Sequence, residues 1–328
     1  MPDASRLQNP AGGIAFILIG MVAISANDML IKFLSGGYPL HQMVFTRSAI
    51  GVFFSLIFVQ MEGGWRILRT DQPGLHILRG LMIVTANMTF FAALAVLPLA
   101  EATALFFAAP LMITLLSIPL LGEKVGPLRL GAVVVGFVGV VIMTRPWETG
   151  GARDVPVYIY LLPVVAALTY AINQVLTRKL GVSSKASAMA VYIQTMFILV
   201  SALFWVLAGD GRHAEGLENE SLIFLLRAWV WPEGRDVWLF LGLGINSAII
   251  GYTLAQAYRL ADAATIAPFE YVGLPLAILW GWVIWRELPG PVVMMGIALI
   301  LGAGLFVFLR EKQKGRRLTR TKRVHRRY

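Results

Sequence analysis

The chain has 328 residues, of which 58% are hydrophobic and 14% charged, with a mean hydropathy of +0.73 and a formal net charge of +10. Soluble domains are about half apolar and about a quarter charged, so this composition indicates an integral membrane protein. The sequence contains no cysteine, which excludes disulfides, thiol nucleophiles and cysteine-ligated metal sites.

Ten apolar segments follow one another along the chain, each close to the roughly 20 residues that cross a membrane as a helix. They are apolar on all sides, without the alternation that a membrane barrel strand needs. We predict spans at 13–34, 40–60, 76–97, 99–119, 128–145, 157–177, 187–208, 237–258, 263–284 and 291–309. The start of the chain is polar and lacks the basic region of a signal peptide, so we expect no cleavage.

Lysine and arginine predict which side of the membrane each connection occupies. With both termini in the cytoplasm, 20 of the 28 basic residues lie inside, seven outside and one, Arg47, within a span. Without the ten basic residues after Leu309 the ratio is 10 to 7. We therefore predict a protein of the bacterial inner membrane with cytoplasmic termini.

Two regions outside the spans are distinctive. The basic tail 310–328 directly follows an apolar span, so we expect it to bind anionic lipid. Nucleic acid is the alternative partner for such a charge run, but the position beside a span favours lipid and no nucleic-acid partner. The long connection 209–236 contains SLIFLLRAWVWPEG, which is too short to span and fits an interfacial segment on the outer side.

Four short patterns recur in the same order in the two halves of the chain. They are ANDMLIK (26–32) with INQVLTR (172–178), PLAEATA (98–104) with RLADAAT (259–265), LGEKVGP (121–127) with WRELPGP (285–291), and the small pair Ala132/Gly136 with Ala298/Gly302. Their offsets are 146, 161, 164 and 166 residues, and the one large jump falls across the 209–236 connection. Each half holds five spans, an odd number, so the second enters from the opposite side. Inverted repeats of this kind are typical of transporters.

With these features the chain resembles the EamA-type members of the drug/metabolite transporter superfamily. The strongest marks are LPLAEATALFFAAPLMITLLSIPLLGEKVG and RLADAATIAPFEYVGLPLAILWGWVIWREL, where Arg286 replaces the usual glycine before Glu287. The resemblance implies an all-α integral membrane protein with ten transmembrane helices as two inverted five-helix EamA repeats. Its parts would be a cytoplasmic N-terminus (1–12), a first repeat (13–145), a second repeat (146–309) with the extracytoplasmic loop 209–236, and the basic tail (310–328).

Polar side chains inside apolar spans are functional candidates, because exposing an ionisable group to lipid costs several kcal/mol. The candidates for substrate binding or coupling are Asn27, Asp28, Arg47, Asn87, Asn173, Gln174, Gln194, Tyr252, Glu270 and Tyr271. We predict no catalytic residue, no metal ligand and no cofactor.

Asp28 and Arg47 each have alternative interpretations. Asp28 either pairs with Lys32 one turn along the same helix face, or faces a cavity beside Asn27. Arg47 remains charged and must find hydrogen-bond acceptors. The alternatives are Asp28, Glu270, a carbonyl or an anionic substrate group.

Glu270 lies between Pro268 and Pro275, about 9 Å from the cytoplasmic end of its span at 1.5 Å per residue. It is either a hydrogen-bonded structural residue or a cavity residue that binds a donor group or a proton. We favour the cavity, because irregular backbone at membrane depth is tolerated where it lines one. In this region the second half of the internal repeat is longer than the first half by about one helical turn.

These features predict a secondary transporter that moves a small polar metabolite by alternating access, with a proton carried by Glu270 or Asp28 as a hypothesis. Members of the EamA-type family that this chain resembles include proposed carriers of riboflavin, S-adenosylmethionine, amino acids and metallophores. Aromatic residues near the polar ones either pack and anchor, which is their commoner role in membrane helices, or stack against a ring-bearing substrate, toward which no other feature points. The alternatives are an intramembrane enzyme, for which no motif is present, and a non-transporting scaffold, which gives no reason for polar residues at depth. No P-loop is present, so the chain is not an ATPase, and the sequence makes no prediction of an oligomeric state.

Overall fold

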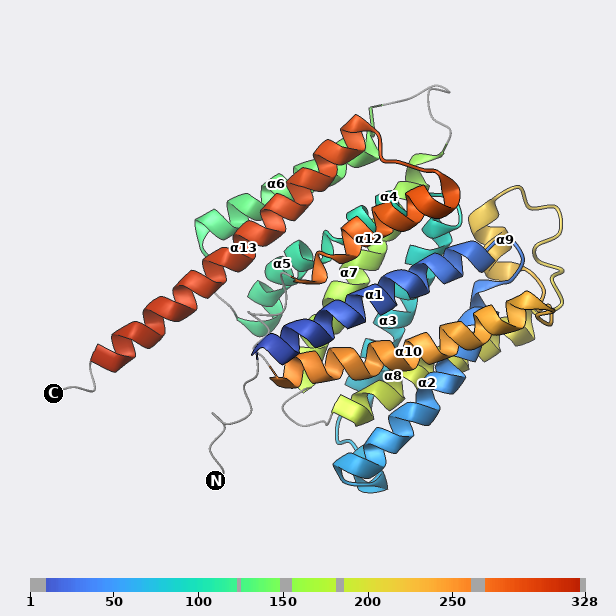
Figure 1. Cartoon of the computed structure of the whole chain (residues 1–328), viewed down its shortest axis with the longest axis horizontal. Helices are drawn as coiled ribbons and strands as arrows, with labels where there is room; N and C mark the ends of the chain where they lie inside the picture. Colours follow the sequence, from blue (N-terminus) through green and yellow to red (C-terminus); the bar gives the residue numbers. More distant parts are fainter. Residues whose placement is uncertain (1–9, 123–124, 148–154, 181–185, 261–268, 325–328) are drawn as a thin grey trace.

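The computed structural model describes residues 10–122, 125–147, 155–180, 186–260 and 269–324, and every regular element in this part of the chain is helical (Figure 1). The elements are α1 (Pro10–Leu34), α2 (Leu40–Glu62), the 3₁₀ turn η2 (Trp65–Leu68), α3 (Pro73–Leu94), α4 (Leu99–Phe106), α5 (Ala109–Leu121), α6 (Pro127–Thr144), α7 (Val157–Leu180), α8 (Ala186–Ala208), α9 (Glu220–Leu226), α10 (Arg235–Leu260), α12 (Gly273–Trp280), the π-helical turn η3 (Gly281–Trp285) and α13 (Pro291–Val324).

Eight of the described helical stretches are long and apolar enough to cross a membrane, and two shorter apolar stretches lie at 273–285 and 291–307. The prediction of an all-α integral membrane protein is therefore confirmed. The helices pack mainly in pairs, α1 with α10, α2 with α8, α3 with α7, and α6 with α13. In Figure 1 α6 and α13 run side by side as a layer of their own beside the other helices.

Small residues let α6 and α13 approach closely. A Cβ atom on Gly139 would lie 2.9 Å from the carbonyl oxygen of Gly296, and one on Gly136 would lie 3.2 Å from the Cβ of Ala303. Gly136 therefore contacts the partner helix as its small-xxx-small pattern predicts. The prediction for Ala298 and Gly302 is wrong, because both are exposed; their face of α13 is turned away from α6, and Gly296 and Ala303 supply the contact.

Two of the predicted spans are broken helices. The span expected at 99–119 divides into α4 and α5 at Phe107 and Ala108. Pro110 lies in the first turn of α5, where its missing N–H leaves no helical bond unmade, so a new helix begins easily there. In the second half Tyr271 and Val272 form a turn just before α12. Pro268 and the start of the predicted span 263–284 lie outside the described residues.

The ends of α5 and η3 share one backbone conformation. Gly122 closes α5 at φ 69°, and Arg286 closes η3 at φ 60°, both in the left-handed region. Glycine adopts this conformation without cost, whereas a residue with a Cβ is disfavoured there. Arg286 thus keeps the turn that the usual glycine would make, and its guanidinium lies over the ring of Trp282 at 5.9 Å.

The long connection between α8 and α10 folds over one end of the bundle. Gln42 donates to the carbonyl of Val230 and accepts from its N–H, and Ser221 Oγ donates to the carbonyl of Ala92 at 2.6 Å. Tyr38, in the α1–α2 turn, donates to a carboxylate oxygen of Asp236 at 2.7 Å. Burial, and then this bond, raise the pKa of Tyr38 above its ordinary value. The connection therefore ties this end of α1, α2 and α3 to the start of α10.

Candidate functional site

A cavity of about 280 Å³ lies inside the bundle, close to the lower limit of about 300 Å³ for small-molecule sites. Its walls come from both halves of the chain. They are formed by Met21, Ile24, Ser25, Asn27 and Asp28 of α1, Arg47 of α2, Ile83, Ala86, Asn87, Phe90 and Phe91 of α3, Leu99, Thr103, Phe106, Phe107, Ala109 and Pro110 of the α4–α5 region, Tyr170 of α7, Leu254 of α10, and Glu270, Gly273 and Ala277 around the start of α12.

A chain of polar contacts runs along one wall of the cavity. Arg47 is 9% exposed, and its Nη1 donates to Asn27 Oδ1 at 3.5 Å. Asn27 Nδ2 in turn donates to Asp28 Oδ1 at 3.2 Å. The Arg47 guanidinium also lies 5.4 Å from the centre of the Phe197 ring, where the ring quadrupole attracts it. Among the alternatives for Arg47, the structure thus gives an indirect connection to Asp28 through Asn27.

Three further cavity residues carry buried polar atoms that have no hydrogen-bond partner among the described residues. They are Ser25 Oγ, Asn87 Oδ1 and Thr103 Oγ1. A buried polar atom without a partner is costly, and native structures hold few of them. Because all three belong to the cavity wall, a bound polar molecule is the partner that would satisfy them.

A second part of the cavity lining is aromatic. Phe90 packs on Phe91 and on Phe106, with ring centroids 5.2 and 5.3 Å apart, and Phe106 packs edge-on against Tyr170 at 5.2 Å. Phe107 meets Tyr271 at 5.4 Å. Such arrays offer ring faces and edges to a planar ligand. The cavity therefore combines hydrogen-bonding groups with a continuous aromatic surface.

Both helix breaks lie at the cavity. Phe107 begins the break between α4 and α5, and Tyr271 begins the one before α12, 164 positions later. The residues just before them, Phe106 and Glu270, both line the cavity. Glu270 therefore lies in the cavity wall beside a helix break, at the position that the 164-residue offset matches with Phe106.

The remaining predicted site residues are not part of the described cavity lining. Gln174 Nε2 donates to the hydroxyl of Tyr170, which does line it. Asn173 is buried beside this pair on α7, and the Gln194 amide packs against Gly51 of α2. Tyr252 is 40% exposed and stacks on Phe58 at 5.5 Å, and the Tyr271 hydroxyl lies against Gly304.

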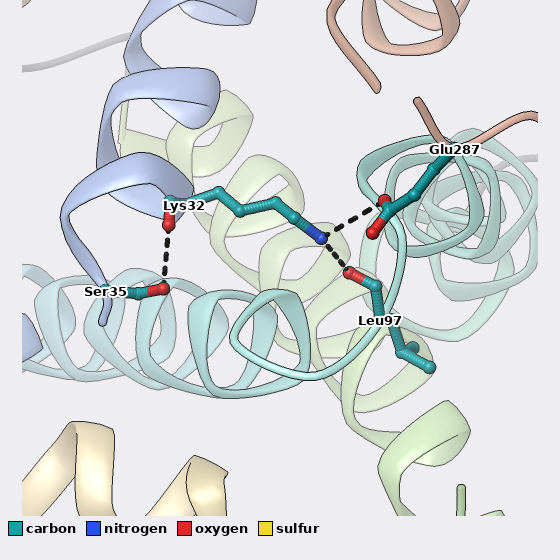
Figure 2. A network of polar contacts seen from close by, with 4 residues as sticks. All are labelled: Lys32, Ser35, Leu97 and Glu287. Atoms are coloured by element: carbon teal, nitrogen blue, oxygen red, sulfur yellow. Dashed lines mark hydrogen bonds and ion pairs between the residues drawn. The ribbon is translucent and has the colours of Figure 1, made fainter. Parts of the chain in front are cut away.

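The expected pairing of Asp28 with Lys32 is not the contact that Lys32 makes. Its Nζ lies 3.6 Å from Glu287 Oε2 and donates to the Leu97 carbonyl at 2.5 Å (Figure 2). The Lys32 side chain extends from the end of α1 to the connection between η3 and α13, and its charged partner is Glu287. Asp28 is left facing the cavity.

The hydroxyl and aromatic residues of the cavity wall that the predicted site did not include are Ser25, Thr103, Phe106, Phe107 and Tyr170, with Phe90 and Phe91. The 164-residue offset held a usable signal, because it matches Phe106 and Phe107 with Glu270 and Tyr271. Ser25 and Thr103 carry no such signal, since small hydroxyls are common in membrane helices and can bond to their own backbone.

Comparison with known proteins agrees with this architecture. The EamA-like transporter family matches residues 11–145. A riboflavin transporter of Vibrio cholerae serotype O1 is 32% identical over 307 residues, covering 93% of each chain. An S-adenosylmethionine uptake transporter of Rickettsia prowazekii is 27% identical, covering 95% of this chain and 97% of the relative. A crystal structure at 23% identity has the same fold, with a TM-score of 0.60 over 91% of this chain and 98% of that one.

These relatives are transporters, not enzymes, and they extend over nearly the whole of this chain. The intramembrane enzyme and the scaffold are therefore not favoured. An all-helical membrane bundle with an internal cavity is the architecture that such carriers need. The chain belongs to the EamA-like transporter family and is a secondary transporter of small metabolites.

Proposed function

We propose that the cavity is the transport site and that it takes a flat heteroaromatic metabolite with polar substituents, with riboflavin as the first candidate. The observation that carries this proposal is that aromatic rings, Phe90, Phe106 and Tyr170, and polar groups line the same cavity. Riboflavin joins a planar ring system to a polyhydroxyl chain, so it presents both kinds of surface. The relative of Vibrio cholerae carries the name riboflavin transporter.

Each wall has a separate task in this proposal. The ring system lies against the aromatic side chains, a contact worth about 0.5–1.5 kcal/mol per pair beyond buried area. The carbonyl, N–H and hydroxyl groups of the ligand bond to Ser25, Asn87 and Thr103, whose polar atoms are otherwise without partners among the described residues. Arg47 and Asn27 are held together and supply further donors at the wall.

S-adenosylmethionine is the second candidate, favoured by the two carboxylates that line the cavity, Asp28 and Glu270. Its sulfonium and amino groups are cationic, and its adenine ring is flat. A neutral flavin needs no carboxylate, whereas a cation gains from each one and from nearby ring faces. The relative of Rickettsia prowazekii carries the name S-adenosylmethionine uptake transporter.

We further propose ten spanning helices in two inverted repeats, 13–145 and 146–309. In chain order, the counterparts in the two halves are α1 and α7, α2 and α8, α3 and α10, and α6 and α13. The packing pairs are symmetric under this exchange: the pair α1–α10 corresponds to the pair α7–α3, and the pairs α2–α8 and α6–α13 each join two counterparts. This symmetry supports the two repeats. The left-handed caps Gly122 and Arg286 also correspond. Residues 209–236 then form the extra connection of the second repeat.

In this arrangement both termini lie in the cytoplasm of a bacterial cell, following the distribution of basic residues. α13 continues as one helix to Val324, past the apolar stretch that ends at Val307. Its basic continuation leaves the membrane on the cytoplasmic side, where anionic lipid attracts it. No nucleic-acid partner is proposed.

Alternating access follows from two halves that surround one central cavity. α6 and α13 pack through glycines and stay together, while the remaining helices open the cavity to one side and then to the other. A proton on Glu270 or Asp28 is the proposed coupling species, because these are the carboxylates of the cavity wall.

Uptake into liposomes tests this proposal. Purified protein is expected to accumulate riboflavin, with S-adenosylmethionine as a competitor of the same site if the cavity accepts both. Asn87→Leu keeps the size of the side chain, removes its hydrogen-bonding atoms, and is expected to reduce uptake at least about fivefold, since an unmade bond costs about 1–3 kcal/mol. Absence of uptake of either compound under every imposed gradient would contradict the proposed substrate class.

A further inference from the structure

A polar contact near the cavity joins segments that are far apart in the sequence. Lys32 at the end of α1, Leu97 in the turn between α3 and α4, and Glu287 between η3 and α13 meet at a single ammonium group (Figure 2). Lys32 Nζ donates to the Leu97 carbonyl and pairs with Glu287, and it also lies 5.2 Å from the ring centre of Trp285. One side chain thus joins α1 to two other parts of the bundle.

This contact lies close to residues that line the cavity. Asp28, which lines the cavity, is one helical turn before Lys32, about 6 Å away along the axis of α1. Leu99, also in the lining, is two residues after Leu97. Leu34 and Leu97 are buried in the main core of the bundle, and Trp285 packs against that core. A substrate leaving past the end of α1 would have to pass between these groups.

We infer that Lys32, Glu287 and the Leu97 carbonyl form the gate that closes the Lys32 end of the transport cavity and that separates when this end opens. The inference rests on the proposed transport site. In the closed state the Lys32 side chain is 9% exposed and the Glu287 side chain 36% exposed. When the end opens, water reaches both charges, so neither is left buried without a partner.

The chemistry suits a contact that must form and break repeatedly. A partly exposed ion pair contributes only modestly to stability, since hydration offsets most of its attraction. A seal made of leucines alone would lose all its buried area on opening. Glu287 also follows Arg286, whose left-handed backbone ends the π-helical turn η3, and π-helical turns occur frequently at functional sites.

The chain contains no cysteine, so a single thiol reports access to the cavity. Ser25→Cys places that thiol in the wall, and a membrane-impermeant maleimide is applied from the Lys32 face or from the opposite face, in intact cells and in inverted vesicles. Lys32→Ala and Glu287→Gln are expected to raise labelling from the Lys32 face about fivefold, the worth of a partly exposed ion pair, and to lower it from the opposite face. Lys32→Arg keeps the charge and is expected to label like the parent.

The exposed pair of Arg212 with Asp210, at 3.4 Å in the same outer region, provides the matched control, and Arg212→Ala is expected to change neither rate. Unchanged labelling in Lys32→Ala and Glu287→Gln, or a rise from both faces, would overturn the gate.

Riboflavin or S-adenosylmethionine added to the purified cysteine-free protein should raise its melting temperature. Failure of that shift contradicts the proposed substrates alone, whereas a shift with unchanged labelling contradicts the gate alone.

Discussion

Phe107 and Tyr271 pack ring against ring, 5.4 Å apart, although 164 positions separate them in the sequence. Each is the first residue of a helix break, one between α4 and α5 and the other before α12. The two breaks therefore meet at the cavity, with Phe106 and Glu270 as their neighbours on its wall. Discontinuous helices in corresponding positions are where transporters commonly build their sites.

The aromatic wall is expected to set the affinity for a planar substrate. Phe106→Leu removes one ring that contacts Phe90 and Tyr170, and should raise the KM for riboflavin about three- to tenfold, following a loss of about 0.5–1.5 kcal/mol. Transport kinetics in liposomes give this value. Phe53→Leu is the control, because Phe53 is exposed on the outside of the bundle; an equal effect of both substitutions would argue against the wall.

Arg47 is expected to hold the polar wall in place. Arg47→Met keeps much of the side-chain length but leaves Asn27 without its donor and removes the guanidinium from the Phe197 ring. Hydrogen bonds to charged groups contribute about 1.5–3 kcal/mol, so riboflavin binding should weaken about 10- to 100-fold. Titration of the purified variant with riboflavin measures this change. Binding at the parent affinity would show that Arg47 has no part in the site.

Glu270 is expected to carry the pH dependence of uptake if it is the coupling carboxylate. Glu270→Gln cannot exchange a proton, so its riboflavin uptake should not vary with pH, whereas parent uptake should. Initial rates across a pH series in liposomes test this, with Asp210→Asn on the exposed loop as the control. The same pH profile in Glu270→Gln and the parent would exclude Glu270 as the coupling group and leave Asp28 as the candidate.

Gly139 is expected to be required for the α6–α13 contact. A Cβ there would lie 2.9 Å from the carbonyl oxygen of Gly296, so Gly139→Ala forces two backbones apart and should lower the melting temperature. Gly131→Ala in the same helix meets nothing within 4 Å among the described residues and should be neutral or stabilising, by about 0.5–1 kcal/mol. Equal melting temperatures for the two variants in detergent would contradict the close contact.

Tyr38→Phe is expected to loosen the connection between α8 and α10. The lost hydrogen bond to Asp236 should cost about 1.5–3 kcal/mol at pH 7, because its acceptor is a carboxylate. Since the folded state raises the pKa of Tyr38, the parent keeps this stability below the ordinary pKa of 10.0 and loses it as the pH rises through the folded value. Melting curves should therefore converge at high pH, and a constant difference from pH 7 upward would contradict the assignment.

Apolar segment length predicted the helices well, because membrane thickness leaves few alternatives. The predicted starts and ends of 40–60 and 187–208 agree with α2 and α8 to within two residues. The break at Phe107 was not predicted. The segment FFAAP contains a single proline, Pro110, and one proline alone does not show where the preceding helix ends. Repeat comparison would have revealed it through Tyr271.

Half of the predicted site residues line the cavity, namely Asn27, Asp28, Arg47, Asn87 and Glu270. Polarity at depth predicts which side chains avoid lipid, but it does not distinguish a cavity from a helix contact. Gln194 avoids lipid by packing on Gly51, and Gln174 by bonding to Tyr170. The partner of Lys32 was missed because Glu287 lies 255 positions away, and local spacing offered only Asp28.

Substrate protection of a single thiol tests the central claim most directly. In Ser25→Cys the thiol lies in the cavity wall, and in Asp210→Cys it lies on an exposed loop. Saturating riboflavin is predicted to slow maleimide labelling of Ser25→Cys several-fold and to leave Asp210→Cys unchanged. If riboflavin is transported while Ser25→Cys labels at the same rate with and without it, the cavity is not the transport site.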